Sequence, residues 1–174
     1  MREFIGYHCN EANVISSAVK NGIYNTSEGH SHWLGNGTYY FEEEPDGLQH
    51  AKTWGRRKKR PKIISNKIKV DDPYLVDLEK NEHKIRINNL KRISIKQILE
   101  LANWTPNDGY IDGVFFNMWD RIFPLTPIHV IRKWEYYVED IDYELKIRSR
   151  MDNAIVLCVR EKECIVKPPI SVVS

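Results

Sequence analysis

The sequence predicts an α+β fold in a single domain, because short apolar strands alternate with amphipathic helical patterns along its 174 residues. Strand patterns cover residues 4–8, 38–41, 63–70, 113–118 and 155–160. Helical patterns cover residues 11–19, 45–54 and 94–102. A chain of this length, with 41% hydrophobic residues, can bury about 70% of its unfolded surface in one core. We therefore expect one domain spanning residues 1–174.

The first predicted strand, Phe4–His8, is followed closely by a helix. Asn10 is a residue type that caps helices, so we expect it to cap a helix over residues 11–19. Asn21-Gly22 is a typical helix end. A polar loop over residues 25–32 then connects this helix to the next strand.

A Gly35-x-Gly37 turn runs directly into an aromatic strand, which ends in the acids at 42–44. Alternation on a strand puts Tyr39 and Phe41 on one face and Tyr40 on the other. One face can then serve the core while the other offers a ring to a cleft, and glycine lets the backbone approach a ligand closely. The alternative is a hairpin edge in a hydrophobic core. Pro45 stands where helices often begin, with apolar residues spaced through Trp54.

The remaining elements are predicted from the same periodicity and capping signals. We expect strand 63–70, a short helix from Asp71 to Leu78, and a helix over 94–102 opened by a capping box at Ser94. Residues 80–92 are too polar to assign. Residues 113–118 form a predicted apolar strand, and residues 134–147 are either helix or hairpin. After strand 155–160, we expect Val166-Lys167-Pro168-Pro169 to end the ordered chain.

A dense basic run occupies residues 56–62, where six of the seven side chains are Arg or Lys and the seventh is proline. Charge runs are commonly solvated loops. The alternative is a contact surface for an acidic or nucleic-acid partner, formed by Arg56, Arg57, Lys58, Lys59 and Arg60.

Composition excludes several classes of function. Lys plus Arg total 26 against 24 acids, so the overall charge indicates no particular partner. Three widely spaced cysteines form neither a disulfide framework nor a zinc knuckle, and His30 and His32 lack further ligands at metal-binding spacing. No apolar run reaches membrane-spanning length, and no signal peptide is recognisable, so we expect a cytoplasmic protein without a metal or a membrane partner.

Three segments together resemble a known family. Tyr7-His8, the Trp33-Leu34-Gly35-x-Gly37-x-Tyr39 turn and strand, and the Ala51-x-x-Trp54 helix resemble the NAD-binding half of the ADP-ribosyltransferases. The closest branch is that of poly(ADP-ribose) polymerases and diphtheria toxin, and the strand at 154–160 is similar to the last strand of bacterial members. The resemblance is good over residues 4–54 and thin elsewhere. It implies a split β-sheet core, with residues 1–62 as the NAD-binding half and residues 63–174 as the remaining sheet and helices.

The resemblance also implies roles for individual residues. His8 matches a histidine that hydrogen-bonds the adenosine ribose, and Tyr39 matches a tyrosine whose ring packs on nicotinamide. Cys9 stands where the family usually has a glycine that pairs with the nicotinamide amide. Gly37 lies in the turn beside the cofactor, and Trp54 falls near a second stacking aromatic. We expect Trp33 to anchor the core rather than contact a ligand.

The third catalytic position of the family is a glutamate at the start of the last strand. Here the sequence reads Asp152-Asn153-Ala154, with no glutamate. Shifting the alignment by one residue puts Asn153 at that position, and shifting it by two puts Asp152 there. An asparagine can hydrogen-bond a ribose but cannot act as a base. Polymer elongation is therefore not expected, whereas transfer of a single ADP-ribose is compatible with the missing glutamate.

Two functions remain open from the sequence. The first is an NAD-dependent mono-ADP-ribosyltransferase, a bacterial or phage toxin-like effector that modifies a protein or nucleic acid and releases nicotinamide. The second is a catalytically silent relative that binds a nucleotide or nucleic acid through the basic run. A third reading is an unrelated α+β domain that carries the motif by chance. Oligomeric state and acceptor are not predicted.

Overall fold

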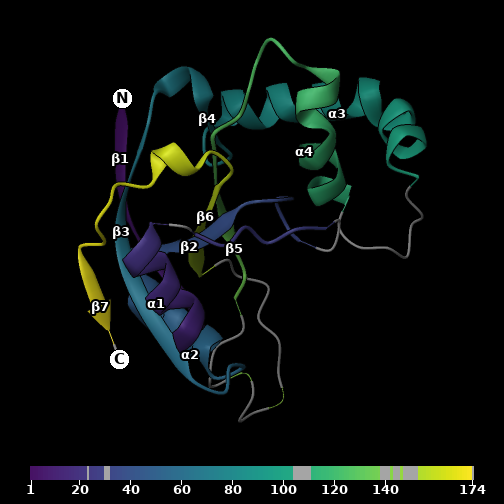
Figure 1. Cartoon of the computed structure of the whole chain (residues 1–174). Helices are drawn as coiled ribbons and strands as arrows, with labels where there is room; N and C mark the ends of the chain where they lie inside the picture. Colours follow the sequence, from purple (N-terminus) through teal and green to yellow (C-terminus); the bar gives the residue numbers. More distant parts are fainter. Residues whose placement is uncertain are drawn as a thin grey trace.

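The computed structural model describes residues 1–22, 24–29, 32–103, 111–137, 142, 146 and 153–173. Within these residues the chain forms a seven-stranded sheet with four α-helices, which confirms the predicted α+β class (Figure 1). The strands are β1 (Arg2–Glu11), β2 (Thr38–Glu42), β3 (Pro61–Val70), β4 (Leu75–Asp77), β5 (Val130–Glu135), β6 (Ala154–Val159) and β7 (Ser171–Val173). The helices are α1 (Ala12–Asn21), α2 (Gly47–Gly55), α3 (Asn81–Ala102), α4 (Ile111–Ile122) and the 3₁₀ turns η1 (Asp72–Tyr74) and η2 (Lys162–Cys164).

The strands lie in the order β4-β5-β6-β2-β1-β3-β7, and every neighbouring pair is antiparallel except β4 and β5. β1 pairs with β3 along its whole length, from Arg2 opposite Val70 to Glu11 opposite Pro61. β1 pairs with β2 at only two positions, Gly6 opposite Glu42 and Tyr7 opposite Phe41. Beyond Tyr7 the two central strands therefore separate, and the sheet opens between them.

Each face of the sheet carries its own apolar cluster. On one face α1 contributes Ile15 and Ala18, which pack with Tyr40 and Ile64. On the other face α2, α3 and α4 pack against residues such as Phe41 and Val156. The predicted alternation of β2 is thus confirmed, because Tyr40 belongs to one cluster whereas Tyr39 and Phe41 belong to the other. Figure 1 shows α1 and α2 near one end of the sheet and α3 and α4 near the other.

Several predicted elements were wrong in type or extent. The apolar run 113–118, predicted as a strand, lies in α4, where Phe115, Phe116 and Trp119 are all buried. A short run that is apolar on every side does not distinguish a buried strand from a buried helix. The predicted helix from Asp71 to Leu78 is a single 3₁₀ turn followed by β4, whose apolar Leu75 and Val76 pair with β5.

The polar segment that could not be assigned forms the first half of α3. Only a thin stripe of this 22-residue helix is buried, at Ile87, Ser94 and Ile98, so its surface polarity hides the helical period. Ser94 does not cap a helix, since its hydroxyl donates to the Leu90 carbonyl within α3.

The ends of two other predicted elements also change. β1 continues through Glu11, so Asn10 is not a helix cap; its side chain accepts a hydrogen bond from the Glu11 amide instead. The chain also remains ordered beyond Pro169, because β7 pairs with β3 through Ile64 and Val172. Of the 134–147 segment, Trp134 and Glu135 end β5, and most of the remainder lies outside the described residues.

Candidate functional site

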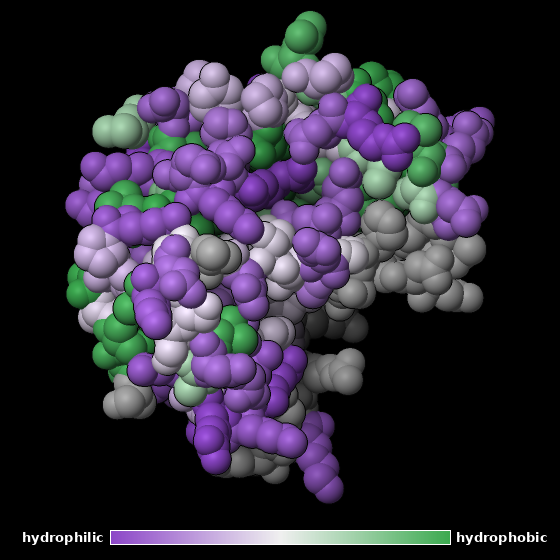
Figure 2. Space-filling view, viewed as in Figure 1, coloured by the Kyte–Doolittle hydropathy of each residue, from purple (hydrophilic) through white to green (hydrophobic). Residues whose placement is uncertain are grey.

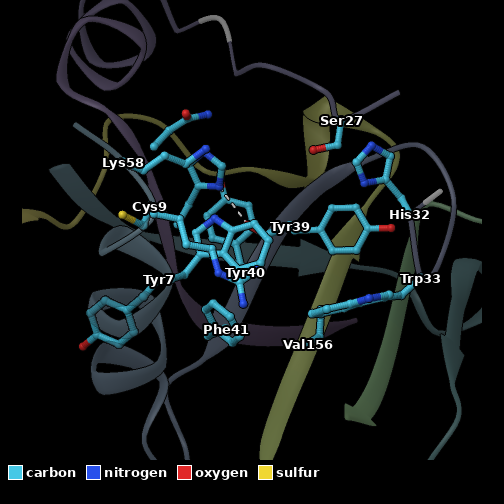
Figure 3. A pocket seen from close by; sticks show the side chains of 14 residues that line it. Tyr7, Cys9, Ser27, His32, Trp33, Tyr39, Tyr40, Phe41, Lys58 and Val156 are labelled. Atoms are coloured by element: carbon cyan, nitrogen blue, oxygen red, sulfur yellow. Dashed lines mark hydrogen bonds between the residues drawn. The ribbon is translucent and has the colours of Figure 1, made fainter. Parts of the chain in front are cut away.

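A cavity of about 280 Å³ lies where β1 and β2 separate. Its walls come from the ends of these two strands, the C-terminal end of α2 and the loop before β2. In Figure 3, Lys58 and Cys9 lie on one side of the cavity and Ser27, His32 and Trp33 on the other, with Tyr39 between them. Four of the predicted ligand residues, His8, Cys9, Tyr39 and Trp54, line this one cavity.

His8 bridges the gap between the separated strands. Its Nδ1 atom lies 2.8 Å from the backbone carbonyl oxygen of Tyr39. A carbonyl oxygen only accepts, so Nδ1 carries the hydrogen and Nε2 of the neutral ring is an acceptor. Burial lowers the pKa of His8, and the nearby Lys58 ammonium lowers it further, against the opposing effect of the Tyr39 carbonyl. The cavity therefore contains a neutral imidazole with an acceptor nitrogen.

Tyr39 is held in place by its hydroxyl group. The hydroxyl donates to the Gly35 carbonyl at 2.6 Å and accepts from the Leu34 amide at 3.0 Å. Burial raises the pKa of Tyr39, so the phenol stays protonated. The hydroxyl is thus committed to the turn before the strand, and the ring is the part of Tyr39 that a ligand can contact.

Two tryptophans form an aromatic wall. The rings of Trp33 and Trp54 meet edge to face with centroids 6.4 Å apart, and both residues line the cavity. The Arg57 guanidinium lies 5.0 Å from the centroid of the Trp54 ring, within range of a cation–π interaction. Trp33 packs against the core as expected, but it also reaches the cavity, which was not expected.

Cys9 occupies the position at which the family usually has glycine. The residue is only 5% exposed, and its side chain packs beside Gly55 at the end of α2. Burial raises the pKa of the Cys9 thiol, with a smaller opposing effect from Lys58, and burial raises the pKa of Cys158 to about 12. Both thiols stay protonated at neutral pH, so neither is poised as a nucleophile.

The Gly35-x-Gly37 turn owes its glycines to packing. Gly35 has a φ of +80°, a conformation that side chains disfavour. A Cβ on Gly37 would overlap Sγ of Cys158 in β6. Asn117 of α4 accepts from the Asn36 amide and donates to the Gly29 carbonyl, so it ties the loop on both sides. Gly37 does not line the cavity, and its contact with a ligand stays a prediction.

Asn153 stands just before β6 and pairs with the backbone of Tyr137. Its side-chain oxygen accepts from the Tyr137 amide at 2.7 Å, and its side-chain nitrogen donates to the Tyr137 carbonyl at 2.8 Å. Tyr137 in turn packs 6.0 Å from Trp54 and 5.1 Å from Phe41, two residues of the cavity wall. Asn153 itself is not part of the lining, so its predicted catalytic role stays a prediction. Asp152 lies outside the described residues.

The basic run is a structured turn. The Glu11 carboxylate accepts hydrogen bonds from the amides of Lys59 and Arg60, at 3.0 and 3.1 Å, and the Arg60 carbonyl accepts from the Ala12 amide. Arg57 and Lys58 line the cavity, whereas Arg56, Lys59 and Arg60 do not; of these five residues, only Lys58 is partly buried rather than exposed. Figure 2 shows strongly hydrophilic side chains gathered at the lower end of the molecule, over the connection from α2 to β3.

Sequence reasoning missed several residues of the cavity. Asn10, Ser27 and Val156 line it although no motif marks them. His32 also lines it, with Nε2 3.1 Å from the Glu28 carbonyl, while His30 lies outside the described residues. Among the described residues, none that lines the cavity is acidic, and none belongs to a metal-binding cluster.

Comparison of the chain with models of known protein families, with curated proteins and with solved structures gives no match. Over the described residues, no helix is both long enough and apolar enough to cross a membrane.

Proposed function

We propose that this chain is an NAD-dependent mono-ADP-ribosyltransferase with the split-sheet fold of that family. The observation that carries the proposal is the convergence of His8, Tyr39 and Trp54 in one cavity. These residues come from β1, β2 and α2, and the resemblance named all three for contacts with NAD. The limited pairing between β1 and β2 also supports the proposal, because a split in the sheet gives a dinucleotide access to both strands.

The side chains that line the cavity support NAD as the ligand. Tyr39 and the two tryptophans offer aromatic faces, which suit a planar nicotinamide cation. The acceptor nitrogen of His8 suits a ribose hydroxyl, and the nearby cations suit a diphosphate. When bound, NAD supplies a glycosidic bond that breaks through an oxocarbenium-like centre.

The protein residues act on this bond mainly by positioning. The aromatic walls hold the nicotinamide ring, and His8 fixes the ribose, so that the bond to be broken faces the acceptor. Loss of nicotinamide from an aromatic pocket then leaves the reactive ribose carbon open to a hydroxyl or amine of a macromolecule. The acceptor is a protein or a nucleic acid, and the exposed basic side chains Arg56, Lys59 and Arg60 are its proposed contacts.

A second candidate is a nucleotide-binding protein without transferase activity. The observation that favours it is the lack of any carboxylate among the described residues that line the cavity, together with the engagement of Asn153 by Tyr137. The described lining therefore lacks the carboxylate that the family uses to polarise an acceptor.

Incubation with labelled NAD and a cell lysate distinguishes the two. A transferase releases nicotinamide and leaves the label on macromolecules, and digestion of aliquots with nuclease or protease then shows which class carries it. Binding of NAD without release of nicotinamide supports the silent protein. Absence of both binding and turnover contradicts both proposals.

A further inference from the structure

Lys58 stands apart from the other cations of the basic run. It lines the cavity, and its side chain is only partly exposed, whereas its neighbour Lys59 is exposed. Figure 3 shows Lys58 on the same side of the cavity as Cys9, close to the hydrogen bond between His8 and Tyr39. Within the described part of the chain, no carboxylate forms an ion pair with the Lys58 ammonium.

The backbone around Lys58 is fixed from both sides. On one side, the amides of Arg57 and Lys58 donate to the carbonyls of Trp54 and Gly55, which continues the end of α2 into a turn. On the other side, the Glu11 carboxylate holds the next two amides at 3.0 and 3.1 Å. A lysine on a fixed turn loses less conformational freedom when it binds than a lysine on a mobile loop does.

Among the described residues that line the cavity, the charged ones are all basic. Arg57 and Lys58 line it, and none of its described lining residues is acidic. The Lys58 ammonium also contributes to the lowered pKa of His8, which places the two groups within electrostatic range. The Glu11 carboxylate is within electrostatic range of Lys58, but it accepts from two backbone amides and forms no ion pair with the Lys58 ammonium. The ammonium can therefore bind an anionic ligand group.

The geometry points to Lys58 as the residue that binds the diphosphate of a dinucleotide in this cavity, with Glu11 as the positioning residue that fixes its turn. This inference rests on the proposed function, because it takes the ligand to be NAD. It also divides the basic run: Lys58 serves the nucleotide, whereas Arg56, Lys59 and Arg60 face outward toward the acceptor. Phosphate oxygens could also come from a nucleic-acid acceptor, and the test separates the two sources.

The test measures binding by calorimetry for the wild type and for Lys58→Ala, Lys58→Arg and Lys59→Ala. The probes are ADP-ribose, adenosine, nicotinamide and a short single-stranded oligonucleotide. We expect Lys58→Ala to weaken ADP-ribose binding about tenfold, as the loss of one charge-assisted contact would, and to leave adenosine and nicotinamide unchanged. Lys58→Arg should retain most of the affinity. Lys59→Ala removes the same charge one residue away and should bind ADP-ribose like the wild type.

Glu11→Ala adds a test of the positioning role. It should weaken ADP-ribose binding, as Lys58→Ala does. In a protein that already carries Lys58→Ala, it should have little further effect. Independent effects of the two changes would overturn the role of Glu11.

Three results would overturn the inference for Lys58. One is that Lys58→Ala binds ADP-ribose as tightly as the wild type does, a result that is compatible with the proposed function. Another is an equal loss for ADP-ribose and adenosine, because a folding defect lowers both. The third is a loss for the oligonucleotide alone, which assigns Lys58 to the acceptor. If the wild type binds neither ADP-ribose nor NAD, the proposed function itself fails, and the inference fails with it.

Discussion

The Nδ1 atom of His8 lies 2.8 Å from the backbone carbonyl oxygen of Tyr39, just beyond the last residue pair that joins β1 to β2. At this point a side chain replaces the backbone ladder as the link between the strands. The link fixes the ring as the Nδ1–H tautomer and leaves Nε2 as an acceptor. It also places His8 and Tyr39, which are 31 residues apart, on the same cavity.

The neutral state of His8 predicts a dependence of ligand binding on pH. Because the pKa of His8 lies below its ordinary value, the acceptor nitrogen is available at neutral pH and is lost as pH falls through that pKa. We expect ADP-ribose affinity to be constant above about pH 6.5 and to fall at lower pH. Lys58→Ala removes a nearby positive charge, so it should raise the His8 pKa and move the loss of binding to higher pH. Titration of the His8 ring by NMR measures the pKa directly.

The free energy of unfolding should also decrease as pH falls, as ligand affinity does. Between the lowered pKa of folded His8 and its ordinary value near 6.5, the unfolded chain binds a proton that the folded chain does not. The contribution of His8 to stability is therefore complete above that ordinary value and declines as pH falls below it. If a His8→Gln variant keeps the full pH dependence of ligand binding, then that dependence does not come from His8.

Substitutions of Tyr39 should separate its ring from its hydroxyl. Tyr39→Phe keeps the ring but loses the bonds to Leu34 and Gly35, so we expect a stability loss of about 1 to 3 kcal/mol with NAD-dependent labelling largely retained. Tyr39→Ala removes the ring and should lower labelling by about tenfold or more. Denaturant unfolding and labelling, measured on the same preparations, give both quantities. Equal labelling by the alanine variant and the wild type would remove Tyr39 from the site.

Asn153 should act through Tyr137. Asn153→Ala leaves both backbone groups of Tyr137 without their side-chain partner, which should cost about 1 to 3 kcal/mol and loosen the wall at Trp54. A glutamate at this position can accept the amide hydrogen but cannot donate to the carbonyl. We therefore expect Asn153→Glu to be less stable than the wild type, with no gain in NAD hydrolysis. A gain in hydrolysis would instead place residue 153 at the ribose, as the resemblance implies.

The sequence predicts strands where alternation or β-branched residues mark them. Strand 63–70 is confirmed as β3 and alternates most clearly over residues 66–70, and the β-branched run 155–160 corresponds to β6, which is buried throughout. The sequence fails for two helices whose period is hidden. The run 113–118 is buried throughout its length, and α3 buries only a thin stripe, so neither shows a clear amphipathic period.

The site was predictable only in part, for a different reason. His8, Tyr39 and Trp54 belong to local motifs, which predicted them as ligand residues, and all three line the cavity. Lys58 could not be distinguished from Lys59 in the sequence, because the difference between them arises from a turn fixed by Glu11, 47 and 48 residues earlier in the chain. The link from Asn153 to Tyr137 and Trp54 is also tertiary and leaves no local pattern.

The exposed half of the basic turn should serve the acceptor. Neutralising all five cations would also remove Arg57 and Lys58 from the cavity, so it cannot separate nucleotide binding from acceptor binding. A variant with only Arg56, Lys59 and Arg60 replaced by glutamine leaves the cavity cations in place. We expect it to hydrolyse NAD at the wild-type rate but to label its acceptor less efficiently.

The salt dependence of this variant gives a second measurement. Contacts between several cations and phosphates release counter-ions, so labelling of a nucleic-acid acceptor by the wild type should fall steeply with salt. The triple variant should show a shallower fall, because it makes fewer such contacts. An acidic protein acceptor would also be salt-sensitive, so nuclease and protease digestion must identify the labelled species first. Arg86, Arg92 and Lys96, which are exposed on α3 and far from the turn in sequence, provide a matched control when replaced in the same way. If the triple variant labels every acceptor as the wild type does at each salt concentration, the exposed part of the turn is only a solvated surface.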